Sequence, residues 1–377
     1  MKRAIVVLML AFGVSALLAQ QQQQGRGAAE PGQGRGQGRG EGRGGAAGVP
    51  AAGGPGAGPA AFTPPPGAVE LQYDATAGIV KLPPDVGTLG EVVGVARNSK
   101  GDFFIYTRAE KQHLYQFDRT GKFMRELGKG GYFQDFAHVV RVDKEDNIWA
   151  VDEGSNMIVK FNPAGEVVMT LGRKWELVDG RPEQPQRGAP PPPGGGRGAN
   201  FNRQTDVAWN PQGEIFVADG YNNARVVKFA KDGDFVKSVG GRGTNPLEFN
   251  TPHSIAADTK GNIYVADRGN NRIQVLDSDL NFKAEWKGFG APWAVCITPG
   301  PNEYLFTADP NGHIYKLDLN GKIVGWLGKY GKDVGEFMWI HELHCQSETE
   351  LYVGEIQNWR MQKIVIKAQG QRATGGR

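Results

Sequence analysis

Two stretches of this chain repeat one another: FNRQTDVAWNPQGEIFVADGYNNARVVKFAKDGDFVKSVG at residues 201–240 and FNTPHSIAADTKGNIYVADRGNNRIQVLDSDLNFKAEWKG at residues 249–288. Each stretch contains four short runs in which apolar and polar residues alternate, separated by turn residues such as Gly, Asn and Asp. Alternation with a period of two is typical of half-buried β-strands. The repeat therefore predicts an all-β protein built from four-stranded units.

The same pattern recurs six times along the chain. The position of His253 corresponds in the successive units to Val93, His138, Thr205, His253, Trp293 and His341. Repeats of about 40 to 50 residues with four strands each are typical of β-propeller blades. We expect a six-bladed propeller over residues 67–377, with a Pro/Gly-rich loop at 173–200 inserted between the second and third blades. The sixth unit contains only three strands, so the segment 71–82 is expected to add the outer strand and close the ring.

The first 66 residues differ in character from the rest. Residues 1–19 place Lys2 and Arg3 before an apolar run, which is the layout of a secretory signal peptide and predicts a periplasmic or secreted protein. Residues 20–66 are rich in Gly, Pro, Gln and Arg and hold few large apolar side chains, so we expect a disordered linker. No other apolar stretch is long enough to predict a further membrane span.

Charge and cysteine content narrow the class of protein. The net charge of +3 is the sum of +4 in residues 1–66 and −1 in residues 67–377, and this near-neutral remainder argues against a nucleic-acid partner. The two cysteines, Cys296 and Cys345, allow at most one disulfide. Both follow predicted innermost strands, so we expect buried small apolar residues rather than a reactive pair.

Three of the six histidines, His138, His253 and His341, occupy the aligned position in alternate units. The innermost strands of a propeller face its central channel, and alternate blades of a six-bladed ring lie about 120° apart, so the three imidazoles should converge. Neutral imidazole is a favoured zinc donor, and three protein ligands with one open position are typical of catalytic zinc. The alternative is three structural histidines. His344 should point to the opposite face by strand alternation and is interpreted as structural.

A second ring of polar residues follows the second strand of several units. Since this strand runs antiparallel to the first, its end should lie at the same end of the channel as the histidines. The residues concerned are Arg108, Tyr221 and Arg268. Two guanidinium groups are suited to hold a substrate carboxylate, and a phenol beside a metal and an arginine is suited to accept a proton. The alternative for each residue is a turn position or an exposed ion pair.

With these residues the chain resembles the NHL-repeat propellers and, among them, the peptidyl-α-hydroxyglycine α-amidating lyase family. The resemblance is clearest at 204–229 and 251–276. It implies cleavage of the N–Cα bond of a C-terminal α-hydroxyglycine to an amide and glyoxylate, with a small-molecule or peptide substrate that ends in a carboxylate. It also implies zinc on His138, His253 and His341, and catalytic roles for Tyr221, Arg108 and Arg268.

The resemblance further implies a structural calcium in the channel. Its expected ligands are the backbone carbonyls of Val95 and Val140 and the carboxylate of Glu342. The chain departs from the family here, because the family usually has Asp at the position of Glu342, which is one methylene longer. Asn222 stands where animal relatives have a disulfide cysteine.

Two other functions fit the same repeat. A non-catalytic NHL propeller would bind a protein or glycan partner through one face and would leave the histidine ring unexplained. A propeller lactonase would hold its metal mainly with Glu, Asn and Asp, and the three histidines count against it. The sequence does not identify the substrate beyond its class.

Overall fold

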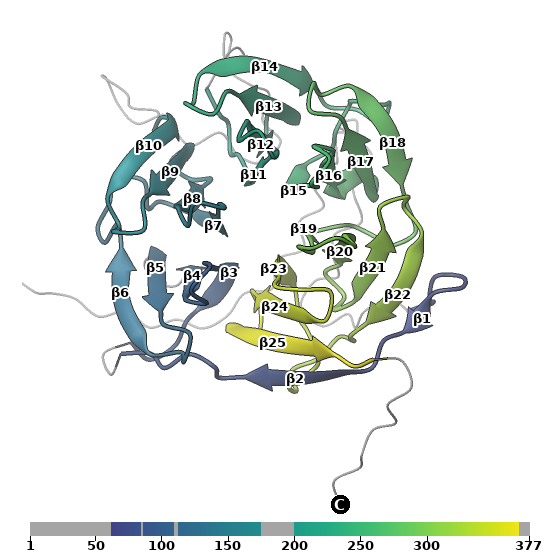
Figure 1. Ribbon diagram of the computed structural model, residues 1–377, viewed down its shortest axis with the longest axis horizontal. Helices are drawn as coiled ribbons and strands as arrows, with labels where there is room; N and C mark the ends of the chain where they lie inside the picture. Colours follow the sequence, from purple (N-terminus) through teal and green to yellow (C-terminus); the bar gives the residue numbers. More distant parts are fainter. Residues whose placement is uncertain (1–61, 84–85, 109–111, 175–199, 369–377) are drawn as a thin grey trace, which may run out of the picture. The chain divides into compact units, whose positions relative to one another are not determined.

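The computed structural model describes residues 62–83, 86–108, 112–174 and 200–368. The predicted signal peptide, almost all of the predicted linker and the inserted loop lie outside these residues. In the part that the structure describes, six β-sheets are arranged around a central axis as the blades of a propeller (Figure 1). The six-bladed propeller predicted from the repeat is confirmed.

The first three blades are regular four-stranded antiparallel sheets. Blade one contains β3 (Glu91–Arg97), β4 (Phe103–Arg108), β5 (Gln112–Phe117) and β6 (Phe123–Leu127). Blade two contains β7 (Ala137–Val142), β8 (Ile148–Asp152), β9 (Met157–Phe161) and β10 (Val167–Gly172). Blade three contains β11 (Asp206–Trp209), β12 (Ile215–Asp219), β13 (Arg225–Phe229) and β14 (Phe235–Gly240).

The last three blades carry the remaining strands. Blade four contains β15 (Pro252–Ala257), β16 (Ile263–Asp267), β17 (Arg272–Leu276) and β18 (Phe282–Trp286), with the short 3-10 helix η1 (Arg268–Asn270) after β16. Blade five contains β19 (Ala294–Ile297), β20 (Tyr304–Ala308), β21 (Ile314–Asp318) and β22 (Ile323–Leu327). Blade six contains β23 (Ile340–Cys345), β24 (Glu350–Glu355) and β25 (Arg360–Ile366).

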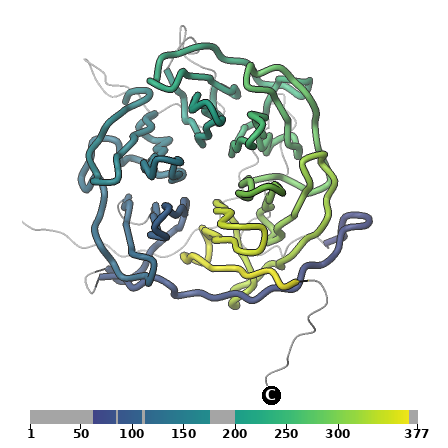
Figure 2. Tube along the Cα trace, in the orientation of Figure 1, coloured from purple at the N-terminus to yellow at the C-terminus, as the bar shows by residue number. Residues whose placement is uncertain are grey.

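The N-terminal segment completes the two blades beside the closure point. β2 (Tyr73–Ala77) pairs antiparallel with β25 and is the outer strand of blade six, as predicted from residues 71–82. Figure 1 shows β2 lying along the outside of β25, and Figure 2 shows the same N-terminal segment running around the rim. β1 (Val69–Glu70), which the sequence does not predict, pairs in parallel with β22 of blade five.

Buried apolar side chains form a cluster in each gap between neighbouring blades. The alternation read from the sequence explains this arrangement, because successive residues of a strand point to the two faces of its blade and each face packs on a neighbouring blade. In blade four, for example, Ile263 and Val265 pack toward blade three while Tyr264 and Ala266 pack toward blade five. The repeated packing holds the six innermost strands around the axis.

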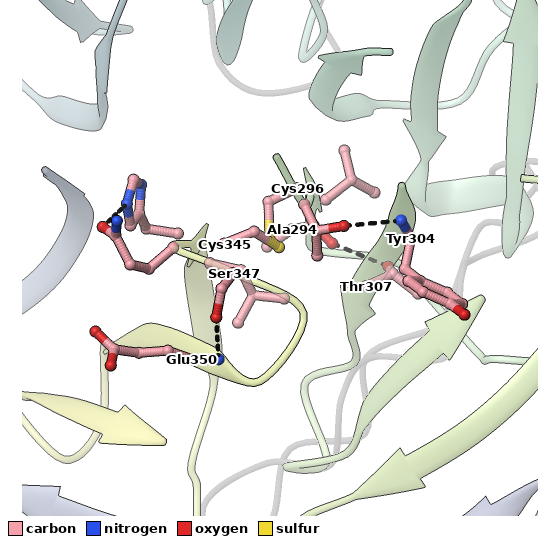
Figure 3. The surroundings of a disulfide bond; sticks show 12 residues. Ala294, Cys296, Tyr304, Thr307, Cys345, Ser347 and Glu350 are labelled. Atoms are coloured by element: carbon pink, nitrogen blue, oxygen red, sulfur yellow. Dashed lines mark hydrogen bonds between the residues drawn. A yellow bond between two sulfur atoms is a disulfide. The ribbon is translucent and has the colours of Figure 1, made fainter. Parts of the chain in front are cut away.

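The two cysteines are linked to each other. Cys296 of β19 and Cys345 of β23 form a disulfide that joins the innermost strands of blades five and six (Figure 3). Both are buried as expected, and they form the one disulfide that the sequence allows, because the innermost strands of neighbouring blades bring their side chains together. No helix within the described residues is long and apolar enough to cross a membrane.

Candidate metal centre

The structure brings the three predicted histidines together. Each is the second residue of the innermost strand of its blade, and in each strand the pairing register shifts at the histidine. Such a β-bulge turns the side chain of the extra residue out of the regular alternation. One ring nitrogen each of His138, His253 and His341 lies within 4.8 Å of the others, and all three residues are buried.

Backbone carbonyls orient two of these rings. His253 Nδ1 lies 2.6 Å from the carbonyl oxygen of Trp293, and His341 Nδ1 lies 2.8 Å from that of Val93. Each Nδ1–H therefore donates to a carbonyl, which leaves Nε2 with its lone pair available to a metal. Val93 and Trp293 occupy the aligned repeat position in blades one and five, so two blades without a histidine supply carbonyl acceptors instead.

The electrostatic surroundings keep His253 neutral. Burial, reinforced by the positive charge of Arg268 and by the neighbouring histidines, holds its pKa well below the ordinary value. A neutral imidazole is the form that binds a metal. Three buried imidazoles within this distance, two of them oriented by carbonyls, fit zinc.

Tyr221 lies directly at the histidine cluster. Its hydroxyl oxygen is 3.3 Å from His138 Nε2 and 3.2 Å from His253 Nε2, and the residue is 5% exposed. The turn after β12 carries Tyr221, whose backbone N–H donates to the Arg203 carbonyl at 3.2 Å. The Tyr221 hydroxyl is therefore close enough to contact a group bound at the three histidines.

Arg268 and Arg108 lie at the same end of the channel but in different surroundings. The Arg268 guanidinium carbon is 5.4 Å from the centre of the Tyr221 ring and 4.4 Å from that of Trp293. Arg108 ends β4, pairs with Glu91 at 2.9 Å and stacks over Phe136 at 4.3 Å. Arg108 also lines a cleft of about 1230 Å³. The structure therefore places Arg268 against the tyrosine, whereas Arg108 lines a cleft together with Glu91 and Phe136.

Sequence reasoning missed an ion pair at this centre. The Glu153 carboxylate is fully buried, lies 3.8 Å from His138 Nε2 and binds Arg203 at 2.6 Å. The Arg203 guanidinium carbon lies 5.8 Å from the centre of the Tyr221 ring. Glu153 follows Asp152 as Arg268 follows Asp267, so the repeat alignment that selected Arg268 contained the signal for Glu153.

The carboxylate expected to hold calcium has another partner. Glu342 Oε1 pairs with Arg141 Nη1 at 2.8 Å, and Arg141 also binds the carboxylate of Asp206 at 2.6 Å. This arrangement does not fit the calcium site expected at Val95, Val140 and Glu342, because a guanidinium already neutralises the carboxylate that a cation would need.

The opposite end of the channel has a separate cavity of about 570 Å³, lined in part by Trp149, Trp209 and His344. His344 lies on this side because it is near the end of β23, whereas His341 is near its start. Burial, together with the positive charges of Arg141 and Arg97, lowers the pKa of His344 to about 4, although an interaction with Gln346 opposes the shift. His344 is thus neutral near pH 7 and separate from the histidine cluster.

Comparison with known proteins confirms the resemblance to NHL propellers. An NHL repeat model matches residues 249–276. The chain is 32% identical over 204 residues to "NHL repeat-containing protein 3" of Mus musculus, covering 51% of this chain and 52% of that protein. It is 32% identical over 167 residues to a "Probable peptidyl-alpha-hydroxyglycine alpha-amidating lyase" of Caenorhabditis elegans, covering 43% of this chain and 42% of that protein. The chain spans about half the length of these relatives.

A solved structure titled "Streptogramin B lyase structure" shares the fold. It superposes with a TM-score of 0.52 at 14% sequence identity, covering 78% of this chain and 98% of that chain. At this identity the likeness concerns the propeller architecture alone.

Proposed function

We propose that this protein is a zinc-dependent lyase that cleaves the N–Cα bond of a peptidyl-α-hydroxyglycine, or of a related N-acyl hydroxyglycine, to an amide and glyoxylate. The observation that carries the proposal is the Tyr221 hydroxyl within 3.3 Å of the Nε2 atoms of two of three converging histidines. The relative named as an amidating lyase supports the same reaction class.

His138, His253 and His341 would hold the zinc. When bound, zinc supplies a Lewis acid that favours ionisation of a substrate hydroxyl. The carbonyls of Trp293 and Val93 keep Nε2 of His253 and of His341 turned toward the centre.

Tyr221 and the arginines would perform the remaining steps. Tyr221 acts as the phenolate: its Oη accepts the proton of the substrate hydroxyl, the C–O bond becomes the aldehyde of glyoxylate, and the N–Cα electron pair leaves with the amide nitrogen. The Tyr221 hydroxyl then returns the proton to that nitrogen, which restores the phenolate. Arg268, whose guanidinium faces the Tyr221 ring, stabilises negative charge on the phenol oxygen. Arg108, in the cleft beside Phe136, would bind the substrate carboxylate.

We also propose that the protein works outside the cytoplasm. The disulfide between Cys296 and Cys345 supports this location, because such bonds persist in oxidising compartments. The arrangement of Lys2, Arg3 and the apolar run after them supports it independently.

The reaction is testable without knowledge of the natural substrate. α-Hydroxyhippurate carries the hydroxyl, the carboxylate and the scissile bond, and the zinc-loaded protein should convert it to benzamide and glyoxylate. Tyr221→Phe should lower kcat by roughly 10²-fold or more while zinc content and folding stay unchanged, since only the proton acceptor is lost.

Tyr315→Phe is the matched control. Its buried hydroxyl binds Asp309 at 3.1 Å on blade five, so its loss should leave turnover intact. If the zinc-loaded wild-type protein releases no glyoxylate from this compound or from hydroxyglycine-ended peptides, the lyase proposal fails and the NHL binding module becomes the better account.

A further inference from the structure

One guanidinium group lies where five blades meet. Arg141 belongs to β7 of blade two, and its side chain is 14% exposed. Its nitrogens contact four of the other five blades. The contacts are Asp206 Oδ1 (2.9 Å) and Oδ2 (2.6 Å) in blade three, Ser254 Oγ (3.2 Å) in blade four, and the Val295 carbonyl (3.5 Å) in blade five. In blade six they are the Leu343 carbonyl (3.4 Å) and Glu342 Oε1 (2.8 Å). A single side chain therefore links the innermost strands of blades two to six.

The acceptors around Arg141 occupy equivalent repeat positions. Asp206, Ser254 and Glu342 each follow the aligned position of their own blade, so they form a ring one residue beyond the histidine ring. Asp206 and Glu342 are 1% and 2% exposed. Two buried carboxylates facing one channel need a cation between them, since unpaired buried charge is strongly unfavourable.

Both carboxylates also accept hydrogen bonds from neighbouring groups of the protein. Asp206 Oδ2 accepts from Ser254 Oγ at 2.7 Å and from the Ile255 N–H at 3.0 Å. Glu342 Oε1 accepts from the Leu343 N–H at 3.0 Å. An arginine guanidinium stays charged in proteins, so it supplies the positive charge that the two carboxylates need.

We propose that Arg141 is the built-in axial cation of this propeller and replaces the calcium expected in the channel. Calcium requires six to eight oxygen ligands at about 2.3–2.6 Å, whereas the Glu342 carboxylate is directed to a guanidinium whose positive charge would repel a second cation. The planar fork of arginine reaches several acceptors at once, which one compact ammonium group does not. The channel is therefore held together without a divalent metal at this level.

The first test uses the wild-type chain. Protein purified without added calcium and dialysed against calcium-free buffer should contain far less than one calcium per chain, and addition of CaCl₂ alone should move Tm by less than about 1 °C. One bound calcium per chain, or a clear rise of Tm with CaCl₂, would overturn the proposal. The test measures calcium content and Tm, so its result does not depend on whether the protein catalyses the lyase reaction.

The second test removes the guanidinium. Arg141→Met should lower Tm by about 5 °C or more, because Asp206 and Glu342 then face each other unpaired. CaCl₂ should recover part of this loss, since a divalent cation now has two free carboxylates. Arg97→Met is the matched control, because Arg97 is similarly buried at 13% exposure but pairs with Glu350 on one neighbouring blade.

The comparison of the two variants decides the role of Arg141. A smaller loss of Tm in Arg97→Met and no response of that variant to CaCl₂ support the axial role, whereas equal losses without calcium recovery in either variant contradict it. If Arg141→Met does not fold, Arg141→Lys keeps the charge but loses most of the contacts. It should still fold with a lowered Tm and remain indifferent to calcium.

Discussion

The orientation of the imidazole separates the proposed metal ligand His253 from the structural histidine His313. His253 directs Nδ1 to a carbonyl and Nε2 toward the other histidines. His313 is also buried, but its Nδ1 lies 3.0 Å from the Asp309 carboxylate, and its ring stacks on Phe62 with 3.8 Å between ring centres. The environment of each ring, rather than the residue type, therefore decides what the histidine does.

This contrast leads to a prediction about metal content. His253→Ala removes one of three ligands, so we expect the protein to lose most of its zinc, measured as metal per chain after purification without chelator. His313→Ala removes an equally buried imidazole far from the cluster and should retain the zinc.

Two results would count against the zinc site. One is unchanged zinc content in His253→Ala. The other is equal loss of zinc from both variants, which would point to general unfolding and not to a lost ligand.

At the scale of secondary-structure elements, a recurring ion pair explains the Asp, Asn and Arg residues that follow the second strand of several repeats. Asp267 at the end of β16 binds Arg272 at 2.8 Å and the side chain of Asn270 at 2.8 Å, and its other oxygen accepts from the Asn250 N–H at 2.7 Å. Asn250 lies three residues before His253. The carboxylate thus ties the end of the second strand to the start of the strand that carries the histidine.

The same arrangement recurs in two other blades. Asp219 with Asn223 and Arg225 forms it in blade three, and Glu355 with Asn358 and Arg360 forms it in blade six. The Asp/Asn/Arg pattern is therefore structural, although it lies next to residues of the candidate site.

Loss of one such ion pair should destabilise the fold. Arg272→Met leaves the buried Asp267 carboxylate without its cation, and we expect the free energy of unfolding to fall by about 3–5 kcal/mol in denaturant titrations. Lys287→Met is the control: Lys287 pairs with Glu285 at the surface and is 59% exposed, so its loss should cost about 1 kcal/mol or less. Similar small losses in both variants would show that the buried pair contributes little.

At the scale of the whole molecule, the ring is closed by segments distant in sequence. β2 pairs with β25 and completes blade six, while β1 adds to β22 of blade five. The disulfide between Cys296 and Cys345 links the inner strands of the same two blades. The closure is thus reinforced at both the outer and the inner radius of the propeller.

The closure predicts different results from two N-terminal truncations. A chain that starts at Phe62 keeps β1 and β2 and should melt like the full chain. A chain that starts at Pro83 exposes the edge of β25 and should melt several degrees lower, measured by the loss of β-sheet circular dichroism. Equal Tm values for the two truncations would contradict a stabilising role of β2.

Much of this architecture follows from the sequence because propeller blades are local structures. The alternation in residues 201–240 and 249–288 specifies which side chains face each blade interface, and the repeat aligns His138, His253 and His341 without any knowledge of contacts. The three-strand sixth unit likewise indicates that an earlier segment has to supply β2. These inferences need only local patterns and the symmetry of the ring.

Only the tertiary structure shows which side chains contact each other between different blades. The Arg141 contacts to Asp206 and Glu342, the Glu153–Arg203 pair near His138 and the Cys296–Cys345 bond each join residues of different repeats. An alignment of repeats identifies equivalent positions, but it does not state which unlike side chains fill the shared space on the axis. The sequence by itself therefore determined the blades and the histidine ring, whereas the three-dimensional packing decided that a guanidinium occupies the channel beneath them, because the pairing of buried charges depends on distances between blades.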